Sequence, residues 1–437
     1  MRFNIFQSLI LLFCVKGFTQ EILTKDDAIE MTLENNLQIQ IARNNREIAN
    51  NNAGVLNSGY LPSLTASAGA SYSLENSERE LVSGDVQEVN NAESNQYSAG
   101  LNLNYTLFDG LGRHYNYKIL KEQSNISELQ VRETIENTIL QLFSVYYEVA
   151  RLTENTATLQ EALHVSKDRL KRARYQFDYG QNTGLDILNA EVDVNTDSIN
   201  LLNAEQLLKN TKRDLNLVMN RELSTQFVID TTVYFVPDLI MQSIVNKSKL
   251  NNAVLMQIER GLLVSDYSYK ASKSNYLPSV GLTGSYGWNK SNTPGGAFLV
   301  SNTADNLSVG LNLTWSLFDG GSTLTRVKNA KINYENQELL KKQAEMEVER
   351  NIQNAWETYE NTLYIYEVQE QNVKTTQDNF FRTEERYKLG RVTSLEFRQA
   401  QINLLNAVLA KNQAKYTAKL AELQVLQVSG QLLNTDF

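Results

Sequence analysis

The sequence predicts an α+β membrane protein in which four strands per chain contribute to a shared β-barrel, continued by long coiled-coil helices. A ten-residue stretch begins at Leu101 and recurs 210 residues later, at Leu311. Both copies alternate apolar and polar side chains, end in Phe-Asp-Gly, and precede more than sixty residues without a proline. Strict alternation is typical of a strand with two unlike faces, and apolar residues spaced three and four apart are typical of a coiled-coil helix.

The duplication extends over nearly the whole chain. We expect a first repeat at 20–220 and a second at 239–437, joined by a short β-prone link. Leu-Pro-Ser follows Tyr60 and again Tyr276, 216 residues later, and a turn glycine recurs at an offset of 210. Because strands, turns and helix phase all match, chance similarity between two helical coils is a poor explanation.

The first repeat begins with an amphipathic helix at 24–59, where apolar residues recur at helical spacing. Alternating residues then predict strands at about 64–74 and 97–107. The residues between them, 75–95, are acidic and amide-rich, and predict a polar loop.

Two helices complete the first repeat, at about 111–179 and 185–219. The first follows a heptad pattern, and sixty-odd helical residues are roughly 100 Å long at about 1.5 Å each. Its apolar seam consists of Leu142, Val145, Val149, Leu152, Thr156, Leu159, Leu163, Ser166, Leu170, Ala173 and Phe177.

The second repeat keeps this order and the phase of the seam. Its expected elements are a helix at 239–275, strands at about 279–289 and 307–317 around a loop at 290–305, and helices at 322–388 and 394–433.

The N-terminus, 1–19, reads as a secretory signal peptide with a positive end, an apolar core and a cleavage site before Gln20. The only cysteine, Cys14, lies inside it. A lipoprotein site would need a small residue before this cysteine, where the chain has Phe13. We therefore expect an exported mature chain without disulfides.

Charge and hydropathy exclude two classes of function. The formal net charge is −9 and becomes −11 once Arg2 and Lys16 leave with the signal peptide. An acidic chain is unsuited to nucleic acid, which selects basic surfaces. No later stretch approaches the roughly 18 apolar residues of a membrane-spanning helix.

The strands instead predict contact with lipid, because about eleven residues match a tilted transmembrane β-strand. Aromatic residues near the strand ends, on the apolar face, predict an interfacial girdle: Tyr72, Tyr97, Tyr105, Tyr286, Trp288 and Trp315. A soluble sandwich would explain any one strand. Four cleanly alternating strands in an exported chain favour the membrane.

Four strands cannot close a barrel, and an open sheet edge in lipid leaves backbone groups unpaired. Two chains would give eight strands with a filled interior, whereas three give twelve strands and a bore. Small polar residues on the second face suit a wet lumen. We expect a homotrimeric, 12-stranded barrel continued by a helical coiled-coil barrel outside the membrane.

The chain resembles the TolC-like outer-membrane channel proteins of tripartite efflux pumps and type I secretion systems. The likeness rests on the duplicated plan, the Leu-Pro-Ser strand entries, the Phe-Asp-Gly strand exits, and the helix tips at Phe177 to Asp186 and Tyr387 to Glu396. It implies a passive conduit, not an enzyme, in the outer membrane of a Gram-negative bacterium. The helices would lie in the periplasm, and the partners would be a periplasmic adaptor and an inner-membrane pump.

The resemblance also implies a gate at the helical tip. Asp186 and Tyr387 occupy the positions of a family acid and tyrosine that bond one another; the matching arginine position is Val392, with Arg391 one residue away. Glu396 fits the first of two acidic constriction positions, and the second is Gln399. A helix N-terminal acid, favoured by the dipole, is the other interpretation of both acids.

The tip turns contain Gly180, Gly184 and Gly390, which the resemblance implies touch the adaptor. We expect no metal and no cofactor, because His114 and His164 stand 50 residues apart without clustered ligands. A trimeric, membrane-anchored coiled-coil adhesin is the alternative function. Drugs, metal ions, peptides and proteins all stay open as cargo.

Overall fold

The computed structural model describes residues 22–237, 239–292 and 300–434. The expected signal peptide at 1–19, Cys14 included, lies outside the described residues. The chain forms two compact units. Of the described residues, those up to 40, those in 134–251 and those from 350 onward form a helical unit, and those in 41–133 and 252–349 form a sheet unit.

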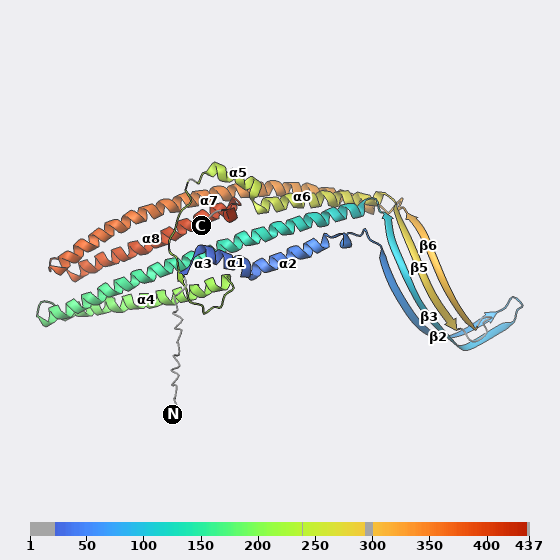
Figure 1. Cartoon of the computed structure of the whole chain (residues 1–437), viewed down its shortest axis with the longest axis horizontal. Coiled ribbons are helices and arrows are strands. Elements are labelled where there is room, and N and C mark those ends of the chain that lie inside the picture. The colour runs from blue at the N-terminus through green and yellow to red at the C-terminus, as the bar shows by residue number, and fades with distance from the viewer. Residues whose placement is uncertain (1–21, 238, 293–299, 435–437) are drawn as a thin grey trace, which may run out of the picture. The chain divides into compact units, whose positions relative to one another are not determined.

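The sheet unit contains a four-stranded antiparallel sheet in the order β2-β3-β5-β6 (Figure 1). Its strands are β2 (Ser63–Glu80), β3 (Val86–Phe108), β5 (Ser279–Asn292) and β6 (Ser301–Thr314). A strand therefore lies at each of the four expected places, and β6 ends three residues earlier than expected.

The expected polar loop at 75–95 is wrong. β2 continues to Glu80 and β3 begins at Val86, so these residues form a two-stranded ribbon with Glu78 opposite Glu88. Backbone hydrogen bonds between the two strands hold this hairpin together. Its strands therefore need no apolar face, and the sequence shows no alternation that would predict them. The loop expected at 290–305 is also shortened at both ends by β5 and β6, and 293–299 lie outside the described residues.

Four long helices dominate the chain: α3 (Gly112–Asp178), α4 (Gly184–Val218), α7 (Ser322–Lys388) and α8 (Ser394–Val428). The expected bounds of α3, α4 and α7 agree with the structure to within a residue, and α8 ends five residues before 433. Two residues after the end of each helix, a residue in the left-handed conformation lets the chain turn. These residues are Gly180, Asn220, Gly390 and Gly430.

The single helices expected at 24–59 and 239–275 are wrong. The structure has α1 (Lys25–Asn35), α2 (Leu37–Asn52) and a 3₁₀ turn η1 (Val55–Asn57) in the first range. It has α5 (Met241–Asn251), α6 (Ala253–Ser272) and η2 (Lys273–Tyr276) in the second. Both breaks occur at an asparagine, 216 residues apart.

Asn36 and Asn252 adopt extended backbone angles, and each side chain accepts a hydrogen bond from the helix that follows. Asn36 also donates to the Val218 carbonyl, 2.8 Å away. Asparagine competes for backbone hydrogen bonds in this way, so a periodic pattern alone does not reveal the break.

The helical unit has one main core. Two two-residue strands, β1 (Ile22–Leu23) and β4 (Val228–Ile229), pair in parallel. They join the segment before α1 to the link between the repeats. The core gathers the largest buried side chains, among them Leu23, Phe143, Tyr146, Tyr147, Leu215, Phe227, Tyr416 and Leu423. Figure 1 shows the α3–α4 and α7–α8 hairpins with their turns at the same end of this unit.

Candidate functional site

One face of the sheet is apolar across all four strands, up to the row that contains Trp288 and Asp305. The ladder places Ala66, Leu101, Tyr286 and Leu307 side by side, and the next row contains Leu64, Leu103, Gly284 and Val309. The opposite face carries rows of small polar residues, such as Thr65, Asn102, Ser285 and Ser308. Side chains on one face keep a period of two, so this division follows directly from the sequence.

The apolar face is uncovered in one chain. Leu307, Val309 and Leu311 are 77%, 71% and 70% exposed. A contiguous exposed apolar surface of this kind is rare in water and marks contact with a partner or a membrane. Within the described part of the chain, β2 and β6 each pair with one strand only, which leaves both outer edges of the sheet open.

Each hairpin tip turns on a glycine at positive φ. Gly180 has φ +73° and Gly390 has φ +69°, and a Cβ at either would meet nothing within 4 Å. The residue after each glycine donates its N–H across the last helical turn: Gln181 to the Gln176 carbonyl at 2.7 Å and Arg391 to the Arg386 carbonyl at 2.9 Å. Glycine is therefore favoured at both positions by the left-handed backbone conformation, and not by a lack of space. The surface beside each turn is open. Gly184 is the first residue of α4.

The two acids expected at the gate begin the helices that leave the turns. The Asp186 carboxylate accepts from the backbone N–H of Thr183 at 3.1 Å and from its hydroxyl at 2.9 Å. The Glu396 carboxylate does the same with Thr393, at 2.7 and 2.9 Å. Each pair is a capping box, which satisfies orphan donors at the helix start.

These bonds hold the pKa of Glu396 below its ordinary value, first through the Thr393 backbone and then through its hydroxyl. The carboxylate is therefore negative at neutral pH, and it lies exposed beside the turn. The structure thus supports the interpretation that these acids cap the starts of their helices. The capping role still leaves the Glu396 carboxylate charged and exposed at the tip.

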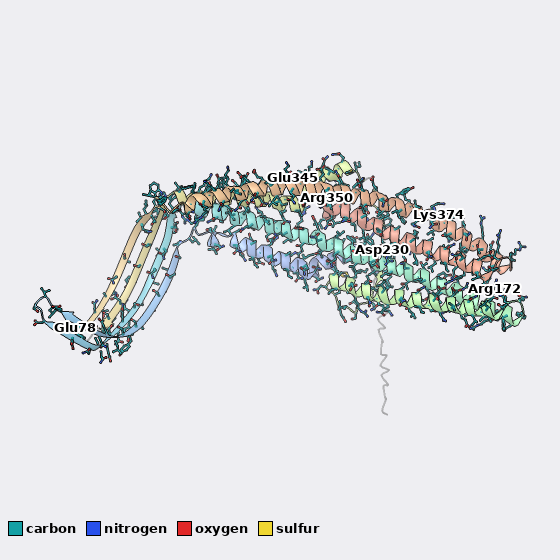
Figure 2. The ribbon with its side chains drawn as sticks, turned by 180° about the vertical axis from the view of Figure 1, so that it is seen from behind. Glu78, Arg172, Asp230, Glu345, Arg350 and Lys374 are labelled. Carbon is teal, nitrogen blue, oxygen red and sulfur yellow. The ribbon has the colours of Figure 1, made fainter. Side chains whose placement is uncertain are left out.

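Tyr387, by contrast, is buried, 7% exposed, in the last turn of α7. Its ring stacks on Phe397 and lies under the guanidinium of Arg172, 5.4 Å from the ring centroid. Arg172 lies near the end of α3 (Figure 2) and donates to the Tyr387 carbonyl at 3.5 Å. In the described residues Asp186 bonds Thr183, and Tyr387 contacts α3 and α8, so one chain does not bring these two side chains together. Arg391 is exposed in the turn.

Sequence reasoning missed a buried set of polar side chains behind the tip. Arg398 of α8 donates to both carboxylate oxygens of Asp197 on α4, at 2.7 and 2.9 Å. Arg169 of α3 pairs with Asp193 of α4, and its Nη1 donates to the Ser394 carbonyl at 3.5 Å. Ser166 and Gln401 complete the set. We call these six residues the tip joint.

The Arg398–Asp197 pair at the centre of the tip joint is buried. The side chains of Arg398 and Asp197 are 10% and 4% exposed. Burial lowers the pKa of Arg398, but the bonds to Asp197 outweigh burial and raise it overall. Removing one partner of such a pair leaves an uncompensated buried charge and costs about 3–5 kcal/mol. One signal in the sequence was Ser166, a polar residue in a position of the apolar seam.

The described residues contain no helix that is both long and apolar enough to cross a membrane. Within the same residues, no three His, Cys, Asp or Glu side chains gather where they could hold a metal ion.

Comparison with known proteins defines the class. Residues 28–221 and 244–431 match the profile of the family described as outer membrane efflux protein. The chain is 22% identical over 409 residues to the outer membrane efflux protein BepC of Brucella suis biovar 1, covering 94% of this chain and 86% of BepC. It is 21% identical to the outer membrane protein TolC of Vibrio cholerae, covering 79% of each. It is also 21% identical to the proteases secretion protein PrtF of Dickeya chrysanthemi, covering 71% and 67%.

Solved structures share the fold. The CmeC outer membrane channel of Campylobacter jejuni superposes with a TM-score of 0.77 at 20% identity, covering 93% of this chain and 86% of CmeC. The outer membrane protein VceC of Vibrio cholerae gives 0.74 at 16% identity, covering 93% and 96%.

The family profile matches both halves of the chain, and it defines the class as outer-membrane efflux channels. The chain belongs to the outer membrane efflux protein family. This membership confirms the resemblance to TolC-like proteins. It also confirms the prediction of an outer-membrane efflux or secretion channel over a coiled-coil adhesin, and the prediction that the chain is not an enzyme.

Proposed function

We propose that three copies of the chain assemble into one conduit across the outer membrane. The observation that carries this proposal is the four-stranded sheet with an apolar face, a polar face and two open edges. Pairing the β6 edge of one copy with the β2 edge of the next leaves no unpaired backbone in lipid. Three copies give twelve strands, a polar lumen and a lipid-facing apolar surface.

The long helices then form a periplasmic barrel. Apart from an apolar stripe on α4, their exposed surfaces carry many charged and polar residues, which argues against a position in lipid. The tips, with the open turns at Gly180, Gly184 and Gly390, are the surface for a periplasmic adaptor, through which an inner-membrane pump delivers cargo. The export signal at 1–19 would place the mature chain on this route.

The tip is also the gate. Threefold repetition turns Asp186, Tyr387, Arg391 and Glu396 into rings around the axis. A ring of carboxylates focuses a negative field and attracts cations. Because Gln399 stands at the second constriction position, the constriction itself has one acidic ring, at Glu396, and its cation preference is modest.

Single-channel recording in a planar bilayer tests the conduit. Detergent-purified protein should produce discrete current steps with a reversal potential that favours cations in a salt gradient. Protein that inserts as an assembled complex yet carries no current contradicts the proposal.

The acidic ring has its own matched test. Glu396→Gln should move the reversal potential toward zero, and Gln399→Glu should move it further toward the cation value. Glu385→Gln, an exposed acid in the last turn of α7, serves as the control and should leave it unchanged. A Glu396→Gln channel as cation-selective as the original would remove Glu396 from the constriction.

A further inference from the structure

The segments that join the helices to the sheet are strongly basic. Four such segments lead into or out of the strands: 51–62, 111–121, 267–278 and 322–331. Together they contain two arginines, six lysines and no aspartate or glutamate, although the whole chain has 50 acidic and 41 basic residues. We call the six lysines the lysine belt: Lys118, Lys121, Lys270, Lys273, Lys328 and Lys331.

The nearest acids before α3 and α7 are already bonded. The Asp109 carboxylate accepts from the backbone N–H of Arg113 at 2.8 Å and from its side chain at 3.2 Å. The Asp319 carboxylate accepts from the backbone N–H of Thr323 at 2.8 Å and from its hydroxyl at 2.6 Å. Within the described ranges, no carboxylate oxygen lies within 4.0 Å of the ammonium groups of four belt residues: Lys118, Lys121, Lys273 and Lys328.

Tyrosine rings hold these lysines beside the sheet. The ammonium groups of Lys118 on α3 and Lys270 on α6 lie 5.2 and 5.7 Å from the centroid of the same ring, Tyr267. Lys121 lies 5.5 Å from the ring of Tyr117, one turn closer to the strands. Helical side chains lean toward the start of their helix, so the lysines of α3 and α7 extend back toward the sheet. Tyrosine with lysine is typical of a membrane interface, where rings lie at headgroup level and ammonium groups reach the phosphates.

The lysines of α3 share one face of that helix. Ring contacts with Tyr60 and with Tyr267 mark its two flanks. At 3.6 residues per turn, Lys118 and Lys121 lie between these flanks, and the uncharged Asn116 lies on the opposite face. The cations are therefore gathered on one side of the helix and are absent from the other.

The second repeat has the same arrangement. Lys118 and Lys121 correspond to Lys328 and Lys331, 210 residues later, and both of these are exposed. One turn before Lys328, on the same face, Leu324 is 51% exposed. A face with exposed apolar and cationic side chains next to each other suits the border between the apolar face of the sheet and water.

The far end of the sheet has the opposite charge. Residues 75–93 contain six acidic residues and one basic residue, and they include the pair of Glu78 and Glu88. Figure 2 shows Glu78 at the end of the sheet that lies away from the helices. The sheet unit is therefore positive where the helices join the strands and negative at the other end.

We propose that the lysine belt binds the phosphates of anionic phospholipids in the membrane leaflet on the helix side. This inference rests on the proposed membrane-spanning barrel. A row of unpaired lysines complements a negative headgroup such as that of phosphatidylglycerol better than a zwitterionic one, in which a cationic group offsets the phosphate. The belt borders a surface that faces lipid in the proposed barrel, so a lipid headgroup is the ligand that reaches it. Three copies would repeat the belt as a ring.

Tryptophan fluorescence tests this inference, because the sheet has a tryptophan near each end of its apolar face. Trp315 follows β6, beside the belt, and donates its indole N–H to the Tyr276 carbonyl at 3.1 Å. Trp288 lies in the far half of β5. A Trp288→Phe/Trp356→Phe protein keeps Trp315 alone, and a Trp315→Phe/Trp356→Phe protein keeps Trp288 alone.

Each protein is reconstituted in vesicles of phosphatidylcholine and phosphatidylglycerol, with bromine on the acyl chains of one lipid or the other. Bromine quenches tryptophan on contact, so the two quenching curves give the relative occupancy of each lipid. The belt variant removes three cations without an ion pair: Lys118→Gln, Lys121→Gln and Lys328→Gln. The matched control removes three exposed lysines of α3 and α7 in the helical unit: Lys167→Gln, Lys171→Gln and Lys374→Gln.

We expect brominated phosphatidylglycerol to quench Trp315 at least twofold more than brominated phosphatidylcholine at equal mole fraction. The belt variant should lose this preference and the control variant should keep it. Trp288 should show no preference for phosphatidylglycerol. Salt at about 1 M, where the Debye length is about 3 Å, should also abolish the preference at Trp315 without any substitution.

Equal quenching of Trp315 by the two lipids overturns the inference, and so does a preference that the belt variant retains. The salt series decides the matter if the belt variant fails to fold, because a preference that persists at about 1 M salt is not one of charge. If neither lipid quenches either tryptophan, the sheet does not lie in the membrane, and the proposed conduit itself is overturned.

Discussion

The ring of Tyr387 lies parallel to that of Phe397, with centroids 4.7 Å apart and an interplanar angle of 6°. Phe397 also stacks on Phe380, so the end of α7 and the start of α8 share one aromatic cluster beside the tip turn. These contacts hold the ring of Tyr387 in place and involve only its faces. Within the side chain, the hydroxyl is therefore the group that could form a gate contact.

Tyr387→Phe separates the packing of the ring from the gate contact of the hydroxyl. The stack and the cation–π contact with Arg172 survive, so the free energy of unfolding should change by less than about 0.5 kcal/mol. If the hydroxyl holds the gate closed, resting conductance should rise. Tyr387→Leu is the packing control and should lose about 1 kcal/mol, the worth of an aromatic pair. Conductance unchanged by Tyr387→Phe would exclude the hydroxyl from the gate.

Acid should destabilise the start of α8. The Thr393 bonds hold the pKa of Glu396 below its ordinary value of 4.5. A carboxyl group whose pKa is lower in the folded state stabilises that state above its unfolded pKa, and loses this contribution as the pH falls through the folded pKa. The thermal midpoints of the original and Glu396→Gln proteins should therefore differ at pH 6 and converge as the pH falls below the ordinary glutamate pKa of 4.5. A difference that persists at low pH would show that Glu396 acts through packing.

Two adjacent tyrosines in the core should respond differently to the loss of a hydroxyl. Tyr146 donates to the Leu23 carbonyl at 2.9 Å, whereas the buried hydroxyl of Tyr147 has no hydrogen-bond partner in the described structure. Tyr146→Phe should cost about 1–2 kcal/mol because it leaves a buried carbonyl less satisfied. Tyr147→Phe should be neutral or stabilising. Denaturant unfolding of the detergent-solubilised protein measures both, and equal costs would contradict this assignment.

Two glycines with the same backbone conformation should tolerate alanine differently. A Cβ at Gly430 would lie 2.4 Å from the Asn251 carbonyl oxygen, whereas one at Gly390 would meet nothing. Gly390→Ala should cost only the left-handed strain, about 1–2 kcal/mol, and Gly430→Ala about 2–5 kcal/mol. Heat-induced dissociation of the assembled protein provides the measurement. Because Gly390→Ala keeps the turn, loss of adaptor binding in that variant would report contact at the tip.

The long helices and the strand faces could be predicted because each depends on a local pattern. The seam position Ile352 is buried, and so is Leu142 in the first repeat. Leu101 and Tyr286 fall in one row because a period of two fixes the face of every strand residue.

Contacts between distant residues could not be predicted in this way. Arg398 and Asp197 are 201 residues apart, and neither belongs to a sequence motif that would indicate which residue it pairs with. The ribbon around Glu78 and Glu88 was not predicted because most of its side chains are polar and do not alternate with apolar ones. The break at Asn36 depends partly on the Val218 carbonyl, which the fold brings close.

The number of chains in the complex tests the account most directly, because the open edges of the sheet demand partners. Native mass spectrometry of the protein released from detergent should show three copies as the only stable assembly, with strand and helix content both retained. A folded monomer that stays in solution without detergent, or a stable dimer, would contradict the shared barrel.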